Sequence, residues 1–160
     1  MDHLGVDIFR INLSHVDINV FEKTVKMVKE WTDKPVCPDS EGAQIRTGNI
    51  TSNVKVLKMG ENIKIRGLGE SLNELDIPLN IQNPQDLLCV GDILRIDFNS
   101  AIVQLIEFNG KDILGRVIKG GIVGKNKGIG IDRTIDLPSF TSKDKLAFKI
   151  SKKLGLDTFF

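Results

Sequence analysis

Polar side chains suited to a binding site alternate with apolar side chains along residues 6–15, VDIFRINLSH. The polar residues are Arg10, Asn12 and Ser14, and the apolar residues are Phe9, Ile11 and Leu13. Because residues two apart share one face of a strand, the pattern predicts a β-strand with one polar and one apolar face. Amide and hydroxyl oxygens bind hard cations, and a guanidinium group binds phosphate. The polar face is therefore either part of a site or simply the wet side of a half-buried strand.

Two further stretches place charged groups and oxygens among glycines. Residues 39–48, DSEGAQIRTG, contain Asp39, Ser40 and Arg46. Residues 115–145, GRVIKGGIVGKNKGIGIDRTIDLPSFTSKDK, contain Lys127 among other lysines and several glycines. Glycine amides and lysine side chains can cradle a phosphate group, and a glycine-bearing turn with solvated lysines is the alternative interpretation.

Three regions with different patterns must position these residues. Residues 1–48 read as strand, helix and strand, an order that favours parallel strands with a crossover helix. Residues 49–136 show short β patterns about ten residues apart and no convincing helix, which predicts a small antiparallel barrel or sandwich. Residues 137–160 return to a helix and end in LDTFF, which predicts the opening of another buried strand.

Local signals predict where the two helices begin and end. The first helix covers residues 19–31, with Asn19 and Glu22 resembling a capping box at its start. For the second helix, Thr141 and Asp144 have capping-box spacing, and Gly155 predicts its C-terminal cap. The apolar stripe of this second helix consists of Ala147, Ile150 and Leu154.

In their order and spacing, these three stretches resemble the pyruvate kinase family over nearly the whole chain. The resemblance implies an α/β plus all-β fold, in which a β-barrel lid is inserted into a (β/α)₈ barrel. A complete barrel of this type needs about 250 residues. The chain is therefore expected to hold a partial barrel of about three strands and two helices in residues 1–48 and 137–160. Residues 49–136 would form the inserted lid, with hinges near Thr47 and Gly48 and near Leu137 and Pro138.

The resemblance also implies roles for particular residues. Arg10, Arg46 and Lys127 match positions that contact substrate or nucleotide phosphates. The residues that match the potassium ligands of the family are Asn12, Ser14, Asp39 and Ser40. Magnesium is implied as a second cofactor, but its carboxylate ligands and the catalytic lysine of the family lie outside these 160 residues. The paired aspartates of the family's lid appear here as Asp97 followed by Phe98.

The implied activity is phosphoryl transfer between phosphoenolpyruvate and ADP in the full-length enzyme, with no turnover expected from these 160 residues alone. The implied ligands are ADP or ATP and phosphoenolpyruvate or pyruvate. Two alternatives remain open: a non-catalytic module that binds nucleotide or phosphate, and an interaction module that reuses the β-barrel. Unpaired strand edges of the partial barrel would also permit a homo-oligomer.

Composition limits the remaining classes of function. The net charge is +1, which argues against a nucleic-acid binder. No apolar run approaches the length of about 20 residues that a membrane span requires, and no signal peptide is expected. The two cysteines, Cys37 and Cys89, form no motif and suggest reduced thiols in a cytoplasmic protein.

Overall fold

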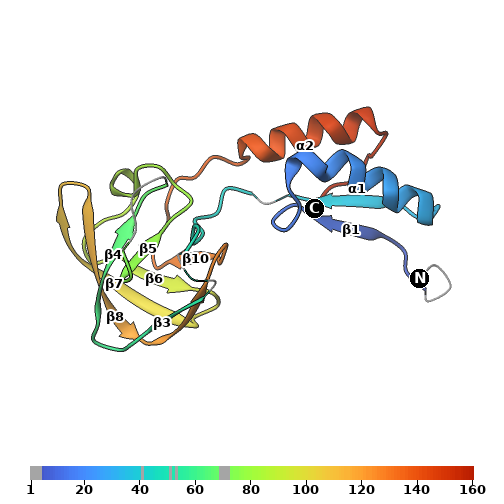
Figure 1. Ribbon diagram of the computed structural model, residues 1–160. Coiled ribbons are helices and arrows are strands. Elements are labelled where there is room, and N and C mark those ends of the chain that lie inside the picture. The colour runs from blue at the N-terminus through green and yellow to red at the C-terminus, as the bar shows by residue number, and fades with distance from the viewer. Residues whose placement is uncertain (1–4, 41, 51, 53, 69–72) are drawn as a thin grey trace. The chain divides into compact units, whose positions relative to one another are not determined.

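A computed structural model of the chain describes residues 5–40, 42–50, 52, 54–68 and 73–160 (Figure 1). The predicted segments 1–48 and 49–136 also contain positions outside the described residues, namely 1–4, 41, 51, 53 and 69–72. The chain divides into two compact units. The first consists of Met1–Ala43 and Pro138–Phe160, and the second of Gln44–Leu137; we call them the α/β unit and the β unit.

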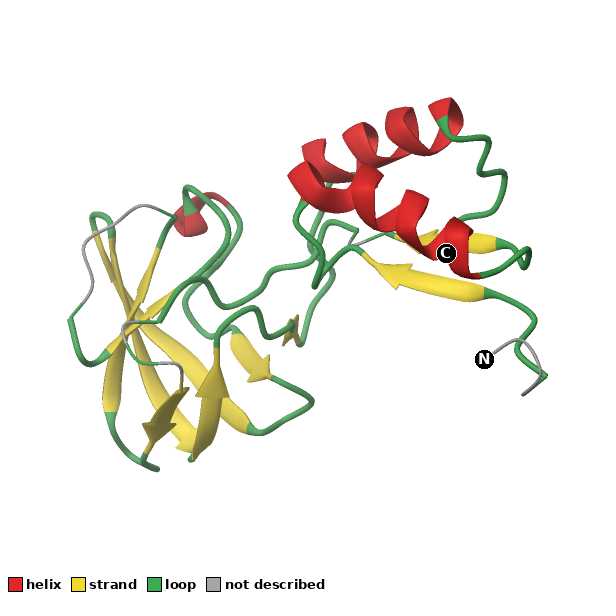
Figure 2. Cartoon of the chain, turned by 45° about the vertical axis from the view of Figure 1, so that its right-hand side comes forward, coloured by secondary structure: helices red, strands yellow, loops and turns green. Residues whose placement is uncertain are grey.

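The α/β unit has the predicted β-α-β start. Strand β1 (Phe9–Asn12) is followed by helix α1 (Ile18–Trp31) and strand β2 (Val36–Asp39), and the two strands are parallel. Helix α2 (Ser142–Lys153) contributes the second helix of this unit. Both helices lie on the same face of the two strands, as the two views in Figure 1 and Figure 2 show.

The alternation along β1 separates an apolar face from a polar one, as predicted. Ile11 and Leu13 are buried in the core of the α/β unit, whereas Arg10 is exposed. The buried side chains packed with them come from both helices and include Phe21, Val25 and Ala147. Burying such side chains contributes about 1.5–3 kcal/mol each for the larger ones, so this apolar face fixes which side of the strand the helices cover.

The helix ends differ from the prediction in one place. The N-cap of α1 is Asp17, whose side chain accepts a hydrogen bond from the backbone N–H of Asn19, so the predicted cap at Asn19 is wrong. An aspartate is at least as good an N-cap as an asparagine, and capping at Asp17 lets the helix begin at Ile18. The capping box of Thr141 and Asp144 is present as predicted, and Gly155 follows α2 with φ of 66°.

The C-terminal residues 156–160 do not form the predicted strand. Only Phe160 bonds to the neighbouring strand: its N–H donates to the carbonyl of Pro38 over 3.0 Å, and its carbonyl accepts from the N–H of Ser40 over 2.8 Å. Two backbone hydrogen bonds from one residue begin a ladder without extending it. The described α/β unit therefore contains two strands, rather than the expected three, with the start of further pairing beside β2.

The β unit is built from two sheets. The strands are β3 (Val54–Leu57), β4 (Asn62–Arg66), β5 (Asp76–Pro78), β6 (Ile93–Ile96), β7 (Ala101–Asn109), β8 (Asp112–Lys119), β9 (Gly121–Gly124) and β10 (Ile129–Ile131). Six form a sheet in the order β10-β6-β7-β8-β4-β5, and β3 pairs with β9. All pairs in these two sheets are antiparallel except β4–β5, which is parallel. One 3₁₀ turn, Pro84–Asp86, interrupts the described β pattern.

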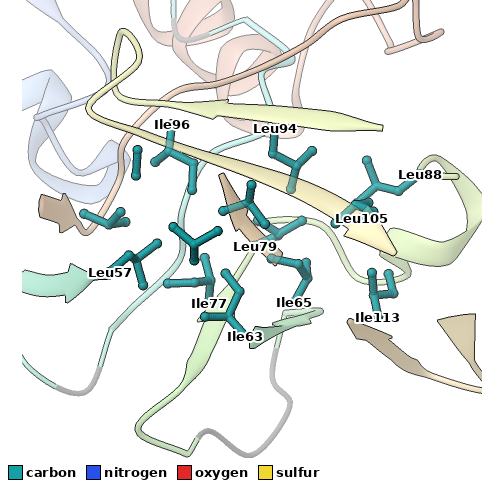
Figure 3. Close-up of a cluster of buried hydrophobic side chains, with 14 of the residues drawn as sticks. Leu57, Ile63, Ile65, Ile77, Leu79, Leu88, Leu94, Ile96, Leu105 and Ile113 are labelled. Atoms are coloured by element: carbon teal, nitrogen blue, oxygen red, sulfur yellow. The ribbon is translucent and has the colours of Figure 1, made fainter. Parts of the chain in front are cut away.

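Both sheets enclose one hydrophobic core (Figure 3). Its side chains come from strands far apart in the sequence, including Leu57, Ile65, Leu94 and Leu105. The apolar block at residues 112–123 is divided between β8 and β9 at Gly120. At the next residue, Gly121, a Cβ atom would lie only 1.9 Å from the carbonyl oxygen of Ser100, so the backbone crosses there only because no side chain intervenes.

Candidate functional site

The predicted site residues of the α/β unit meet at the carboxyl ends of β1 and β2. Asn12 and Asp39, the last residues of the two strands, are direct register partners. The N–H of Leu13 donates to the carbonyl of Asp39 over 3.0 Å and continues the pairing past the end of β1. Because parallel strands end at the same edge, the two stretches recognised separately in the sequence are brought to one place.

Side-chain bonds orient the polar groups at this edge. The Asn12 side-chain carbonyl Oδ1 accepts a hydrogen bond of 2.8 Å from the N–H of Ser14. Arg10 Nε lies 3.5 Å from Asp39 Oδ2, and these side chains are 58% and 22% exposed. An ion pair this exposed contributes little to stability. Arg10 therefore remains accessible for an anionic ligand while Asp39 holds it near the edge.

Two further residues, Lys143 and Cys37, lie near this edge. Lys143, near the start of α2, donates from Nζ to the carbonyl of Leu13 and thus adds a positive charge that the sequence interpretation missed. Cys37 lies within β2 and is fully buried. Burial raises the pKa of its thiol, so at neutral pH it stays protonated and takes no part in binding a cation.

The oxygens offered at this edge are of the kinds that bind hard cations. Asn12, Ser14, Asp39 and Ser40 offer amide, hydroxyl and carboxylate oxygens, but only one carboxylate. Within the described ranges, no group of three or more His, Cys, Asp or Glu side chains is placed to bind a metal. A single carboxylate with neutral oxygens is compatible with potassium.

The two remaining predicted residues, Arg46 and Lys127, come together in the β unit. Arg46 forms an isolated antiparallel bridge with Gly128, next to Lys127. The Arg46 guanidinium donates from Nη1 to the carbonyl of Asn126 over 3.0 Å and from Nη2 to Gln44 Oε1 over 3.0 Å. Two residues that are 81 positions apart in sequence therefore contribute their positive charges to one turn between β9 and β10.

Thr47 organises this turn, a role that the sequence interpretation missed. Its hydroxyl donates to the carbonyl of Gly124 over 2.7 Å and accepts from the N–H of Lys127 over 2.8 Å. Its backbone carbonyl accepts from the N–H of Asn126, and its N–H donates to the carbonyl of Lys127. These bonds tie Thr47 into the β unit, which begins three residues earlier, at Gln44.

The bonds to Thr47 and Ile45 also occupy three backbone amides of this turn. The N–H groups of Asn126 and Lys127 donate to Thr47, and the N–H of Ile129 donates to the carbonyl of Ile45. Because these three amides donate to groups within the β unit, they are not available to a ligand. The turn also carries the positive charge of its side chains.

Lys127 has a carboxylate partner in the neighbouring turn. Its Nζ lies 3.2 Å from Asp97 Oδ2, and the N–H of Asp97 donates to the carbonyl of Gly128 over 2.9 Å. The turn after β6 is thereby joined to the turn before β10. The aspartate was visible in the sequence, but only the pairing of β6 with β10 brings it to the lysine.

The geometry leaves two sets of predicted residues, each organised within its own unit. Arg10, Asn12, Ser14, Asp39 and Ser40 belong to the α/β unit, and Arg46 and Lys127 belong to the β unit.

Within the described residues, neither helix is long and apolar enough to cross a membrane.

Comparison with known proteins gives a consistent match over the whole chain. Residues 1–160 match the family described as pyruvate kinase, barrel domain. The chain is 30% identical over 159 residues to pyruvate kinase of Aeropyrum pernix, and 28% identical over 159 residues to that of Corynebacterium glutamicum. Each alignment covers 96% of this chain, and 33% and 34% of the respective relative. The chain therefore spans about a third of the length of these curated relatives.

Proposed function

Since the chain belongs to the pyruvate kinase family, we propose that it contributes part of a site for phosphoryl transfer between phosphoenolpyruvate and ADP in a longer protein. The observation that carries this proposal is the grouping of the predicted residues at two places. Oxygen donors and an arginine gather at the ends of β1 and β2, and two cationic side chains gather at one turn of the β unit. The match to the barrel domain along all 160 residues supports this function, and no observation favours the alternative of a non-catalytic binding or interaction module derived from the same family.

In this proposal the α/β unit binds the cation and one phosphate. The oxygens of Asn12, Ser14, Asp39 and Ser40 hold potassium, which supplies positive charge beside the phosphoryl group. Arg10 binds a phosphate oxygen through its guanidinium group, which stays charged and matches phosphate geometry. Asp39 contributes to both binding functions. Its carboxylate is one of the proposed potassium ligands, and its Oδ2 lies 3.5 Å from Arg10 Nε. Magnesium would be held by residues outside these 160.

The β unit is proposed to act as a lid inserted into the barrel, with Arg46 and Lys127 binding nucleotide phosphates. Closure of such a lid excludes water, which strengthens the attraction between fixed cations and the moving phosphoryl group. Arg46 has its guanidinium bonded to Asn126 and Gln44, so it is already oriented before a ligand arrives. We also propose a cytoplasmic location, which is where the substrates of this reaction are found.

Calorimetric titration of the 160-residue chain with ADP tests the nucleotide-binding part of the proposal. We expect Lys127→Met to weaken ADP binding at least about tenfold, because a charge-assisted hydrogen bond contributes about 1.5–3 kcal/mol. Lys125→Met, two residues away in the same turn, is the matched control and should change affinity less than twofold. Equal losses of ADP affinity in both variants would show that binding depends only on the overall charge of the turn.

The cation and the turnover are tested separately. Replacing potassium by tetramethylammonium should weaken phosphate binding in the wild-type chain but not in Asn12→Leu, which removes one proposed ligand.

A coupled assay should detect no ADP-dependent pyruvate formation from the 160 residues alone, since the family's catalytic lysine lies outside them. Pyruvate formation above that of a mock preparation would contradict this assignment of roles.

A further inference from the structure

The turn between β6 and β7 presents a phenylalanine to solvent in an unusual backbone conformation. The Phe98 side chain is 99% exposed. Its φ is 52°, and its neighbours Asp97 and Asn99 have φ of 48° and 71°. A positive φ is costly for a bulky residue, and exposing an aromatic ring forgoes its burial. Both costs fall on the same residue, and such local strain is concentrated at functional sites.

The turn is held by its other residues, so the ring is displayed from a fixed support. The N–H of Asp97 donates to the carbonyl of Gly128, and the N–H of Ser100 donates to the carbonyl of Asp97. Lys119 Nζ donates to the carbonyl of Asn99 over 2.8 Å. None of these bonds uses the phenylalanine ring. Its position is set by the backbone, and its face remains available to a ligand.

The charges around this turn favour an anionic ligand. Three basic side chains contact it: Lys127 pairs with Asp97, Arg95 donates to Asn99 Oδ1 over 3.3 Å, and Lys119 bonds to the carbonyl of Asn99. The acidic groups in the same network are Asp97 and Asp132, the latter paired with Arg95. Three positive and two negative charges leave an excess of one positive charge beside an exposed aromatic face. A ligand that combines a phosphate with a planar ring satisfies both features.

We propose that Phe98 is a stacking platform for the base of a nucleoside diphosphate or triphosphate whose phosphates bind Lys127. Phe98 is then a specificity-determining residue that distinguishes nucleotides from other phosphates. The contact between Lys127 and Asp97 places the phosphate-binding group beside the residue that immediately precedes Phe98. This inference rests on the proposed function, because it assumes that the turn near Lys127 binds nucleotide phosphates. Phe98 occupies the position at which the resemblance predicts the second of two aspartates.

Titrations with ADP and with inorganic pyrophosphate separate base recognition from phosphate recognition. Aromatic stacking contributes enough that Phe98→Ala should raise the Kd for ADP about fivefold or more. The Kd for pyrophosphate should stay within twofold of wild type, since pyrophosphate has no base. Phe98→Trp should retain ADP affinity. Met59→Ala, which truncates another exposed apolar side chain of the β unit, is the control and should change neither Kd.

A spectroscopic readout reports contact with the ring directly. The chain has one tryptophan, Trp31 in α1, so the double variant Trp31→Phe, Phe98→Trp carries a single indole at the proposed platform. Its emission should change on addition of ADP and remain constant with pyrophosphate. Equal emission changes with both ligands would indicate a movement of the turn rather than stacking.

The outcomes distinguish this inference from the function on which it rests. If wild type binds ADP and Phe98→Ala binds it equally well, the stacking role is refuted and the proposed function stands. If Phe98→Ala weakens ADP and pyrophosphate to the same extent, the residue is merely structural and the inference also fails. If the wild-type chain binds neither ligand, the proposed nucleotide site is refuted together with the stacking role.

Discussion

Replacing Thr47 by valine should loosen the turn that carries Lys127 without changing the shape of the buried side chain. Thr47 is 2% exposed, and its hydroxyl joins the carbonyl of Gly124 to the N–H of Lys127. Valine fills nearly the same volume but can neither donate nor accept a hydrogen bond. Thr47→Ser is the matched control, because it keeps the hydroxyl and removes only a methyl group.

The magnitude follows from the groups left without a partner. Gly124 is buried, so losing the bond to its carbonyl should cost about 1–3 kcal/mol. The N–H of Lys127 is only half-buried and water can replace part of its bond, so about 0.5–1.5 kcal/mol is expected there. The sum for Thr47→Val is about 1.5–4.5 kcal/mol, whereas Thr47→Ser should cost about 1 kcal/mol for the lost methyl group. In a domain of this size, 1 kcal/mol corresponds to about 4–8 °C in Tm.

Amide hydrogen exchange and fluorescence distinguish the two units in this measurement. Faster exchange of peptides from the β unit in Thr47→Val should accompany the lower Tm, measured by far-UV circular dichroism. Trp31 lies in α1, so its fluorescence follows the α/β unit and should report an unchanged transition. The reasoning is refuted if Thr47→Ser loses as much stability as Thr47→Val, because the hydroxyl would then contribute nothing.

Two further predictions concern one ion pair and one helix cap. Arg133 donates to both carboxylate oxygens of Asp92, and this hydrogen bonding lowers the pKa of Asp92. The lowered pKa stabilises the fold above the ordinary aspartate pKa of about 4, and this stabilisation is lost as the pH falls through the folded-state pKa. Arg133→Met should therefore reduce the urea midpoint at pH 7 and make it less sensitive to acid; parallel pH profiles of wild type and variant would contradict this. Thr141→Ala should cost the α/β unit about 1 kcal/mol, measured by Trp31 fluorescence in urea, while Thr141→Ser should cost less because it retains the cap.

The features predicted correctly from sequence are those set by short-range patterns. Ile11 and Leu13 alternate with polar residues, and this two-residue alternation was enough to predict which face of β1 is buried. Thr141 and Asp144 lie three residues apart, so their capping box is complete within one helical turn. The misplaced cap of α1 has a similar explanation: Asp17 and Asn19 are both good caps, and only the observed helix start selects between them.

The arrangement in the β unit depended on contacts that leave no local signal. The bond between Thr47 and Lys127 joins residues 80 positions apart, and Asp97 meets Lys127 only through strand pairing. Strands β5 and β10 are three residues each, too short for an alternating pattern to indicate them. The sequence thus predicted that positive charge gathers at this turn, but not that the amides of Asn126, Lys127 and Ile129 are already bonded.

The separate cores of the two units limit how substitutions can influence each other. The core around Ile11 and Phe21 shares no residue with the core around Ile65 and Leu105. Stability losses at sites without shared partners add to within about 0.3–0.5 kcal/mol. The losses from Thr141→Ala in one unit and Thr47→Val in the other should therefore be additive in the chain without ligand.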